Sequence, residues 1–347
     1  MKRILVAPLH WGLGHATRCI PLINALIEHN FEPIIASDGS ALELLKKEFP
    51  NLLAFELPSY DISYSKKPGR FKLKLLKTSP HILRTIRREK SVIKQLVKKE
   101  SISGVISDNR FGVRDKSIPS VYITHQLNVL SGRTTWISSK LHQNIIKKFD
   151  QCWVPDLDSN TNLSGDLGRP KQKIKNVKYI GTLSRFEKEK LDKTIDILVV
   201  LSGPEPQRTQ LEKKLLLELK NKKENIVFIR GMVEDKQKIT YLGNITLYNY
   251  MTSKKLEHAI NSSNLIISRS GYTTIMDLAK LGKKAVFIPT PGQFEQLYLA
   301  EKLNENLIAP SFEQDTITSS DLKVHPNYSG FETLNSEINF KELFSLF

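Results

Sequence analysis

The arrangement of residues 265–277 limits the fold of this chain more than any other segment does. An apolar run that ends at Ile267 leads into a tight turn with Ser270 and Gly271, and the first turns of a helix begin near Thr273. A helix that starts at the end of a strand points its free backbone N–H groups, and the positive end of its dipole, at the space above the strand. Phosphates and other anions bind at such places, so this segment predicts an anion site.

Two further strand ends carry polar residues toward the same edge of the expected sheet. The apolar strand at 285–288 leads into a proline-rich loop that ends at 293–296, and the strand at 196–201 leads into a Ser-Gly turn before a helix. Ligands of open α/β sheets bind outside the carboxyl ends of the strands, so the three loops strengthen the predicted site. The candidate ligand-facing residues in these loops are Ser202, Gly203, Arg208, Arg269, Ser270, Gly271, Thr273, Gln293, Glu295 and Gln296.

Strand and helix signals alternate through both halves of this 347-residue chain, which is longer than one typical core requires. The alternation predicts an α/β fold in which helices cover parallel sheets. Around 159–185 the chain lacks helical periodicity and contains three Gly, one Pro and several Lys, as an interdomain connection would. We expect a first domain at 1–165, a linker at 166–190, a second domain at 191–330 and a closing C-terminal helix within 331–347. The expected strands are 3–8, 32–36, 104–107, 120–124, 151–154, 196–201, 225–229, 245–248, 265–268 and 285–288, and the expected helices are 15–29, 40–48, 208–220, one from 273 and one within 335–347.

The first strand–helix turn contains Gly12 and Gly14, followed by His15. Its pattern is GxGxxR, and no acidic residue closes the second strand, so support for a nicotinamide dinucleotide site is weak. We interpret His15 as a group directed into a cleft, where it serves as a general base or donates a hydrogen bond to a substrate oxygen. The alternative is a histidine that only caps or packs the helix.

Asp108 follows the strand at 104–107 and is expected at the same sheet edge as His15. A carboxylate there can hold the imidazole in one tautomer and raise its basicity. Alternatively, Asp108 simply caps the following turn. His125, after the strand at 120–124, is a second strand-end histidine of lower rank.

Residues 66–99 concentrate positive charge. They contain thirteen Lys and Arg against one acid, Glu89, and so supply +12 of the formal net charge of +16. Apolar residues recur at helical spacing in the later part, which predicts an amphipathic helix. Such a helix can lie on an anionic membrane, each near-surface cation contributing about 1 kcal/mol, or it can be a solvated face over the core. Nucleic acid is not the expected partner, because aromatic residues are sparse and no known nucleic-acid motif accompanies the charge.

Other classes of site find little support in the sequence. Cys19 and Cys152 are too few for a disulfide scaffold and lack metal-binding spacing. Asp156-Leu157-Asp158 matches a short DxD metal-binding pattern, but it stands at a strand end, and we interpret it as turn chemistry. No run of roughly eighteen apolar residues occurs. We therefore expect a cytoplasmic protein that has no cofactor and no bound metal.

The second half of the chain resembles the donor domain of the GT-B glycosyltransferases, in the group of MurG and the monogalactosyldiacylglycerol synthases, with a family 28-like C-terminal domain. The residues that carry the resemblance are Arg269-Ser270-Gly271 through Asp277 and then Gln293 to Gln296, and the likeness is specific over about 245–303. It implies two Rossmann-like parallel-sheet domains that face each other across a cleft. It also implies inverting sugar transfer from a nucleotide diphosphate donor, such as a UDP-sugar, without a bound metal.

The resemblance also implies roles for individual residues. Gly271 and its neighbours would face the diphosphate, and Asp277 would bind the ribose, although the family usually has Glu there. The backbone near Met251 would meet the base, and Glu295 and Gln296 would contact sugar hydroxyls. The segment 66–99 would correspond to a membrane-facing patch. From the first domain, Gly14 and His15 would line the cleft, and the C-terminal helix would return to that domain.

One turn is also similar to a hydrolase. Gly14-His15-Ala16-Thr17-Arg18-Cys19 matches the Gly-His-x-x-Arg-Cys turn of PseG, a nucleotide-sugar hydrolase of the GT-B fold that uses water as the acceptor. The favoured interpretation is transfer to a lipid-linked or membrane-proximal acceptor, with His15 and Asp108 as catalytic residues, by a cytoplasmic protein that can be peripheral on the inner face of the membrane. The alternatives are such a hydrolase and a non-catalytic nucleic-acid-binding protein.

Overall fold

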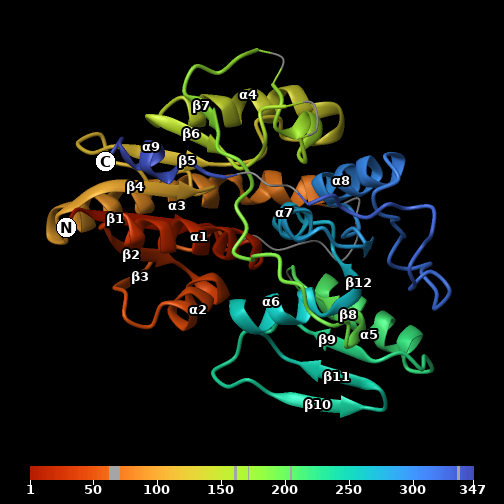
Figure 1. Cartoon of the computed structure of the whole chain (residues 1–347). Coiled ribbons are helices and arrows are strands. Elements are labelled where there is room, and N and C mark those ends of the chain that lie inside the picture. The colour runs from red at the N-terminus through yellow and green to blue at the C-terminus, as the bar shows by residue number, and fades with distance from the viewer. Residues whose placement is uncertain (62–70, 160–161, 171, 204, 334–336) are drawn as a thin grey trace.

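The first half of the chain forms a seven-stranded parallel sheet in the order β3-β2-β1-β4-β5-β6-β7 (Figure 1). The computed structural model describes residues 1–61, 71–159, 162–170, 172–203, 205–333 and 337–347. Apolar runs such as 4–7 are buried on both faces, as is typical of parallel strands between two layers of helices. The strands are β1 (Arg3–Pro8), β2 (Glu32–Ser37), β3 (Ala54–Glu56), β4 (Ile102–Asp108), β5 (Ser120–Ile123), β6 (Gln151–Val154) and β7 (Val177–Tyr179).

Helices cover both faces of this first sheet. On one face, α1 (Gly14–Glu28) and α2 (Gly39–Glu48) pack their apolar residues against β1 and β2, and Asn30 ends the α1 segment in the left-handed conformation at φ 62°. On the other face lie α3 (Phe71–Lys99), through Ile93 and Leu96, and α4 (Thr135–Ile146), through Ile146. Short 3₁₀ turns occur at Gly132–Thr134 and Gly165–Leu167.

The second half forms a six-stranded sheet in the order β10-β11-β9-β8-β12-β13, with β10 antiparallel to β11 and the other pairs parallel. Its strands are β8 (Ile195–Val200), β9 (Ile226–Ile229), β10 (Ile239–Leu242), β11 (Ile245–Tyr248), β12 (Ser263–Ser268) and β13 (Ala285–Phe287). Its helices are α5 (Gln207–Leu219) on one face and, on the other, α6 (Ser253–Asn261), α7 (Tyr272–Leu281) and α8 (Phe294–Glu305).

The two halves are joined by packing and by the C-terminus. One apolar core runs from α1 and α2 into α6 and α7, and Figure 1 shows α1 and α7 meeting between the two sheets. The last helix, α9 (Phe340–Phe344), lies on the first domain, where Phe344 makes edge contacts with Phe31 and His29. The chain thus crosses from the first sheet to the second and returns.

The expected linker at 166–190 begins too early. Residues 177–179 form β7, which pairs in parallel with β6 as the edge strand of the first sheet. This strand is only three residues long, so its alternation of Val177, Lys178 and Tyr179 is too short to stand out in the sequence, although Val177 and Tyr179 pack on the core of the first domain. The connection between the two sheets is therefore residues 180–194.

Candidate functional site

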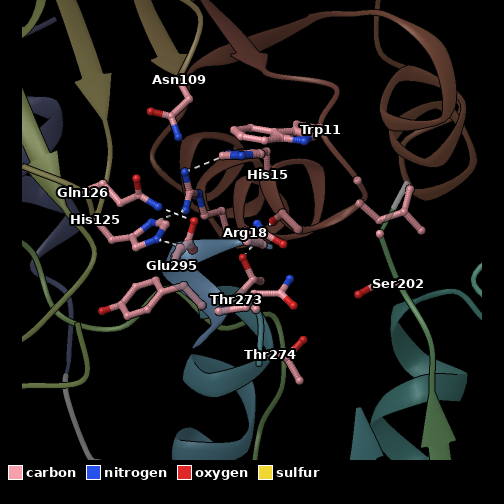
Figure 2. Close-up of a pocket in the computed structure, with 18 residues that line it drawn as sticks. Trp11, His15, Arg18, Asn109, His125, Gln126, Ser202, Thr273, Thr274 and Glu295 are labelled. Carbon is pink, nitrogen blue, oxygen red and sulfur yellow. Dashed lines mark hydrogen bonds and ion pairs between the residues drawn. The ribbon is translucent and has the colours of Figure 1, made fainter. Parts of the chain in front are cut away.

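A cavity opens between the two halves at the carboxyl ends of their strands (Figure 2). Its walls come from loops that follow β1, β4 and β5 in the first sheet and β8, β12 and β13 in the second. This is the edge at which open α/β sheets bind ligands. The lining residues are Trp11, Gly12, Leu13, Gly14, His15, Arg18, Asn109, His125, Gln126, Ser202, Gly203, Gly271, Tyr272, Thr273, Thr274, Gln293, Glu295 and Gln296.

The N-termini of three helices point at this cavity. Helix α1 begins at Gly14, α7 at Tyr272 and α8 at Phe294, and residues of each first turn line the cavity. In α7 the first helical bond runs from Ile275 N to Gly271 O, so the preceding N–H groups remain outside the helical ladder. The N–H groups and dipoles of three helices make the cavity a favourable place for a polyanion.

The backbones of the two domains approach closely at glycines. Gly12 has φ 79° and Gly203 has φ 105°, and a Cβ added to Gly12 would lie 3.6 Å from Gly203 Cα. Next to them, the Thr273 hydroxyl donates a hydrogen bond of 3.0 Å to the carbonyl of Gly14. The expected pair of Gly-rich turns thus faces each other across one space.

His15 and Asp108 are in direct contact, as the strand-end placement predicted. His15 Nδ1 lies 2.8 Å from Asp108 Oδ1, and Arg18 forms a bidentate ion pair with the same carboxylate. Burial alone would raise the pKa of Asp108, but Arg18 and His15 lower it to about 2, so the group is a carboxylate that only accepts. Nδ1 of His15 therefore carries the hydrogen, although Arg18 Nη2 lies 2.9 Å away, and Nε2 keeps a lone pair.

The Gly-His-x-x-Arg-Cys turn has a structural explanation in these contacts. His15, Arg18 and Cys19 stand on one side of α1, three and four residues apart, and all three reach Asp108, with Cys19 Sγ at 3.7 Å. Arg18 and Asp108 are almost fully buried. The motif thus places three side chains of α1 around one carboxylate, and we call His15, Arg18, Cys19 and Asp108 the Asp108 cluster.

His125 connects the Asp108 cluster to the second domain. Arg18 Nη1 donates to His125 Nδ1 at 3.1 Å, and His125 Nε2 lies 2.8 Å from Glu295 Oε1. Burial lowers the pKa of His125, so the ring is neutral with its hydrogen on Nε2, donating to Glu295. The ring also stacks on Tyr272 at 4.1 Å between centroids. This lower-ranked histidine is therefore part of the contact between the two domains.

The loop after β13 places Glu295 and Gln296 as predicted, at the cavity wall. The Glu295 carboxylate also accepts a hydrogen bond from the Gln126 amide, so two residues of the first domain hold it. Gln296 Oε1 accepts from Thr290 N at 2.8 Å, and Ser270, which does not itself line the cavity, donates to Gln296 O. Gly271, Thr273, Gln293, Ser202, Gly203 and Gly14 line the cavity as expected.

The two arginines predicted to face the ligand do not line the cavity. Arg269 is 1% exposed and donates to the carbonyls of Ile288, Pro289 and Gln207, so it ties the strand-end loops together. Arg208 is paired with Glu205 and Glu212. A buried guanidinium must satisfy its donors, and in both cases nearby carbonyls or carboxylates do so.

Asp277 and Met251 also lie away from the cavity. The Asp277 carboxylate accepts a hydrogen bond of 2.7 Å from Ser184 in the connection between the sheets, and the positive charge of Arg185 acts to lower its pKa. Burial raises the pKa of Asp277 to about 6. Met251 is half-buried and packs on the common core. The predicted ribose contact is thus replaced in this structure by a contact with the connecting segment.

Six cavity residues were not singled out from the sequence, namely Trp11, Leu13, Asn109, Gln126, Tyr272 and Thr274, and four of them share a recognisable kind of position. Trp11, Asn109, Gln126 and Thr274 follow strand ends or open a helix, in the same positions as the predicted residues (Figure 2). The signal that could have identified them is that each lies within three residues of a β1, β4 or β5 terminus, or in the first turn of α7.

The structure gives no support to a metal site in the DxD segment. Asp156 accepts hydrogen bonds from the backbone N–H groups of Leu157, Leu163 and Ser164, which confirms its interpretation as turn chemistry. Asp158 pairs with Arg169. Among the residues that the structure describes, no group of three or more His, Cys, Asp or Glu is placed to hold a metal ion.

The face of the first domain that carries α3 and α4 is basic and partly apolar. Of the basic segment, residues 66–70 lie outside the described residues, as do the side chains of 71–79. From 80 onward α3 exposes its cations, while its one acid, Glu89, is buried and accepts from Arg110 and from Gly112 N. On α4, Trp136 is 70% exposed and Leu141 62%. The exposed cations of α3 are Arg84, Arg87, Arg88, Lys90, Lys94, Lys98 and Lys99.

No helix in the described part of the chain is both long enough and apolar enough to cross a membrane. The basic α3 is 29 residues long but amphipathic.

Comparison with known proteins identifies the second domain. Residues 198–325 match the glycosyltransferase family 28 C-terminal domain. Two curated relatives are UDP-N-acetylglucosamine--N-acetylmuramyl-(pentapeptide) pyrophosphoryl-undecaprenol N-acetylglucosamine transferases. The one from Bacillus pumilus (strain SAFR-032) is 25% identical over 234 residues, 64% of this chain and 62% of the relative. The one from Buchnera aphidicola subsp. Schizaphis graminum (strain Sg) is 39% identical over 67 residues, 19% of each chain. The matched part thus spans less than two thirds of these relatives.

Solved structures share the fold of the whole chain. The glycotransferase of kitacinnamycin superposes with a TM-score of 0.59 at 13% identity, covering 92% of this chain and 88% of that one. A UDP-glucosyltransferase from Polygonum tinctorium gives 0.59 at 12% identity, covering 92% and 87%. MurG of Acinetobacter baumannii gives 0.50 at 16% identity, covering 93% and 88%. At these identities the likeness concerns the fold, which is GT-B, as the resemblance implied.

Proposed function

This chain is a GT-B protein with a family 28-like C-terminal domain, and from that premise we propose that it is an inverting glycosyltransferase that uses a nucleotide diphosphate sugar, with a UDP-sugar as the first candidate. The observation that carries the proposal is the convergence of three helix N-termini on one cavity that also contains His15. The N–H groups suit a diphosphate, and the histidine suits the deprotonation of a hydroxyl group.

In the proposed reaction the acceptor oxygen attacks the anomeric carbon of the donor sugar. The oxygen–carbon bond forms as the bond from that carbon to the diphosphate oxygen breaks. The acceptor proton passes to Nε2 of His15, and Asp108 stabilises the resulting imidazolium through Nδ1. The leaving diphosphate gathers charge, which the N–H groups at the start of α7 stabilise electrostatically. These groups supply the stabilisation without a metal, so we propose metal-independent transfer.

In this proposal, Glu295 and Gln126 bind the hydroxyl groups of the transferred sugar. Both side chains line the cavity between the start of α8 and the end of β5, and each already takes part in the hydrogen bonding that joins the two domains. A carboxylate in that position can accept hydrogen bonds from sugar hydroxyls.

We propose a lipid-linked or membrane-proximal acceptor on the basis of the α3–α4 face. It combines a row of exposed cations with the exposed Trp136 and Leu141, and both helices cover the same side of the first sheet. Cations draw a protein to anionic lipids, and tryptophan side chains favour the membrane interface. The Bacillus pumilus relative acts, by its name, on a pyrophosphoryl-undecaprenol substrate.

The experiment that tests the proposed function is a thermal-shift panel of UDP- and dTDP-sugars, followed by assays of nucleotide release. Ligand binding stabilises the folded state by mass action, so the true donor should raise the melting temperature. We expect nucleotide release to accelerate when membrane lipid extract is added and to be unaffected by EDTA. Rapid stoichiometric release of free sugar without any acceptor would instead establish the hydrolase. Absence of binding to every nucleotide sugar would refute both.

A further inference from the structure

Asn109 has a backbone that few residue types adopt, at a position that faces the cavity. It follows Asp108 directly at the end of β4 and has φ 58°, in the left-handed region. Its N–H donates to Ile123 O at 3.3 Å, which holds this turn against the end of β5. Asparagine, aspartate and glycine tolerate this conformation better than other residues do. The turn directs the Asn109 side chain into the wall of the cavity.

The buried Tyr122 determines which end of the Asn109 amide faces the cavity. The Tyr122 hydroxyl donates a hydrogen bond of 2.9 Å to Asn109 Oδ1. Tyr122 is fully buried among Phe111, His142 and Phe149, and burial raises the pKa of its hydroxyl well above the usual value, so the group stays protonated and donates. Since its oxygen is engaged by Tyr122, the amide presents its Nδ2 hydrogens to the cavity.

Donor groups surround the space in front of Nδ2. Figure 2 shows the Asn109 amide nitrogen turned toward His15 and Arg18, and its oxygen turned away from them. Arg18 can only donate, and its guanidinium is already engaged by Asp108 and His125. No hydrogen bond joins Nδ2 to any of the described residues. A ligand atom next to the Asn109 amide and the Arg18 guanidinium must therefore be a hydrogen-bond acceptor. A ligand atom next to Nε2 of His15 must carry a hydrogen that it can donate.

A hydroxyl group or a water molecule satisfies both requirements. We propose that Asn109 binds the oxygen of the acceptor, an inference that rests on the proposed function and assigns the acceptor oxygen its place within that site. The oxygen accepts a hydrogen bond from Nδ2 through one lone pair and gives its own hydrogen to His15 Nε2. Its second lone pair attacks the anomeric carbon, the bond from that carbon to the diphosphate breaks, and the proton remains on His15.

Asn109 is then an acceptor-binding residue rather than a turn residue alone, and the two roles are separable. Glycine and aspartate both suit the left-handed backbone, but neither can donate a hydrogen bond from this side chain position. If Asn109 only forms the turn, Asn109→Gly and Asn109→Asp should both work as well as the wild type. If Asn109 binds the acceptor oxygen, both variants should have a lower turnover number while their affinity for the nucleotide is unchanged.

The test measures release of UDP from UDP-N-acetylglucosamine, or from the panel member that the wild type turns over fastest, with water and with added methanol as acceptors. We expect both variants to lower kcat at saturating donor at least thirtyfold for either acceptor, with the Kd of UDP within threefold of the wild type. Tyr122→Phe, which frees the amide to rotate, should produce a smaller loss. Asn30→Gly is the matched control, because Asn30 also has a left-handed backbone, at φ 62°, but is exposed and outside the cavity.

The outcomes separate this inference from the proposed function. If the wild type releases a nucleotide but both Asn109 variants keep rates within threefold of it, Asn109 does not bind the acceptor and the inference is overturned. If the wild type neither binds nor turns over any nucleotide sugar, the proposed function fails, and the inference fails with it. Should Asn109→Gly lose UDP binding through misfolding, Asn109→Asp, which keeps an oxygen for Tyr122, still decides the matter.

Discussion

His15 Nδ1 lies 2.8 Å from Asp108 Oδ1, and Arg18 binds both oxygens of the same carboxylate. The three residues come from the first helix and the end of β4, and the carboxylate is fully buried. Because Asp108 is held ionised, it fixes the hydrogen of His15 on Nδ1 and leaves Nε2 as the atom that can accept a proton. The site therefore contains a base whose orientation is set before any ligand arrives.

Replacing His15 with alanine should lower turnover strongly while nucleotide binding persists. General-base catalysis typically contributes about 10²–10⁴-fold, and His15 is not needed for the N–H groups of α7 to hold a diphosphate. Steady-state kinetics at saturating donor, combined with calorimetric titration of UDP, measure the two effects separately. A variant with weakened UDP affinity and normal turnover would show that His15 belongs to the donor site instead.

Asp108→Asn should destabilise the fold, in addition to its effect on catalysis. The substitution leaves the buried Arg18 guanidinium without its carboxylate, and breaking a buried ion pair on one side costs about 3–5 kcal/mol. The double variant Asp108→Asn with Arg18→Met removes both charges and should regain part of that loss. Urea unfolding of the three proteins measures the difference. Equal stability of the wild type and Asp108→Asn would mean that Arg18 finds another partner.

The loops of the site were predictable from sequence because they depend on local chemistry. Glycines at strand ends, a helix start after Gly271 and polar residues after apolar runs mark positions where the backbone must turn at the sheet edge. The contact of His15 with Asp108 followed from the same rule, since the carboxyl ends of neighbouring parallel strands β1 and β4 meet. Most strands were located to within two residues for this reason, as hydrophobic runs define them.

The errors concern side chains whose partners lie far away in sequence. Arg269 was expected to bind phosphate, but its donors meet carbonyls that only the folded loops bring near. Asp277 was expected to face a ribose, but a serine of the connecting segment, 93 residues earlier, approaches it. Trp136 was not noticed because exposure of one helix face is a property of the assembled layer rather than of the local sequence. Charge and residue type alone do not reveal such partners.

Glu295→Gln should impair recognition of the sugar more than that of the nucleotide. Hydrogen bonds to a charged group contribute about 1.5–3 kcal/mol, so losing the charge should reduce kcat/KM roughly 10–100-fold, while UDP, which lacks the transferred sugar, should bind as before. Kinetics with the donor and titration with UDP give the comparison. Glu301→Gln, at an exposed position of the same helix, is the matched control. A parallel loss of UDP affinity would place Glu295 at the diphosphate.

Asp277 should make stability depend on pH in the mildly acidic range. Its folded pKa of about 6, raised by burial, exceeds the unfolded value of about 3.9, so the folded state holds this proton more tightly. Its contribution to the free energy of unfolding is therefore largest below pH ~4 and is lost as the pH rises through ~6, by up to about 3 kcal/mol. Asp277→Asn should flatten that dependence in urea unfolding at pH 4.5 and 7.5.

The control for this experiment is Asp192→Asn, at an exposed position in the connecting segment. It should leave the pH dependence of the wild type unchanged. If Asp277→Asn shows the same loss of stability between pH 4.5 and 7.5 as the wild type, another buried group is responsible.

Changing Lys94, Lys98 and Lys99 together to glutamine should weaken binding to anionic vesicles. All three side chains are exposed on α3, on the same side of the first sheet as α4, with its exposed Trp136. With about 1 kcal/mol contributed per near-surface cation, the loss should approach 10²-fold in the partition coefficient at physiological salt. Sedimentation with phosphatidylglycerol vesicles measures it, and the effect should shrink as salt rises, because exposed charges are screened.

The matched control removes the same charge from the other domain. Lys213, Lys220 and Lys223 are exposed on α5 and just beyond it, so their change to glutamine alters the net charge equally without touching α3. If both triple variants lose the same affinity, the vesicles respond to net charge alone and the α3–α4 face has no special part in binding. If only the α3 variant loses affinity for the vesicles, while its turnover of a nucleotide sugar with water is unchanged, the α3–α4 face binds the membrane and so brings the cavity close to a membrane-bound acceptor.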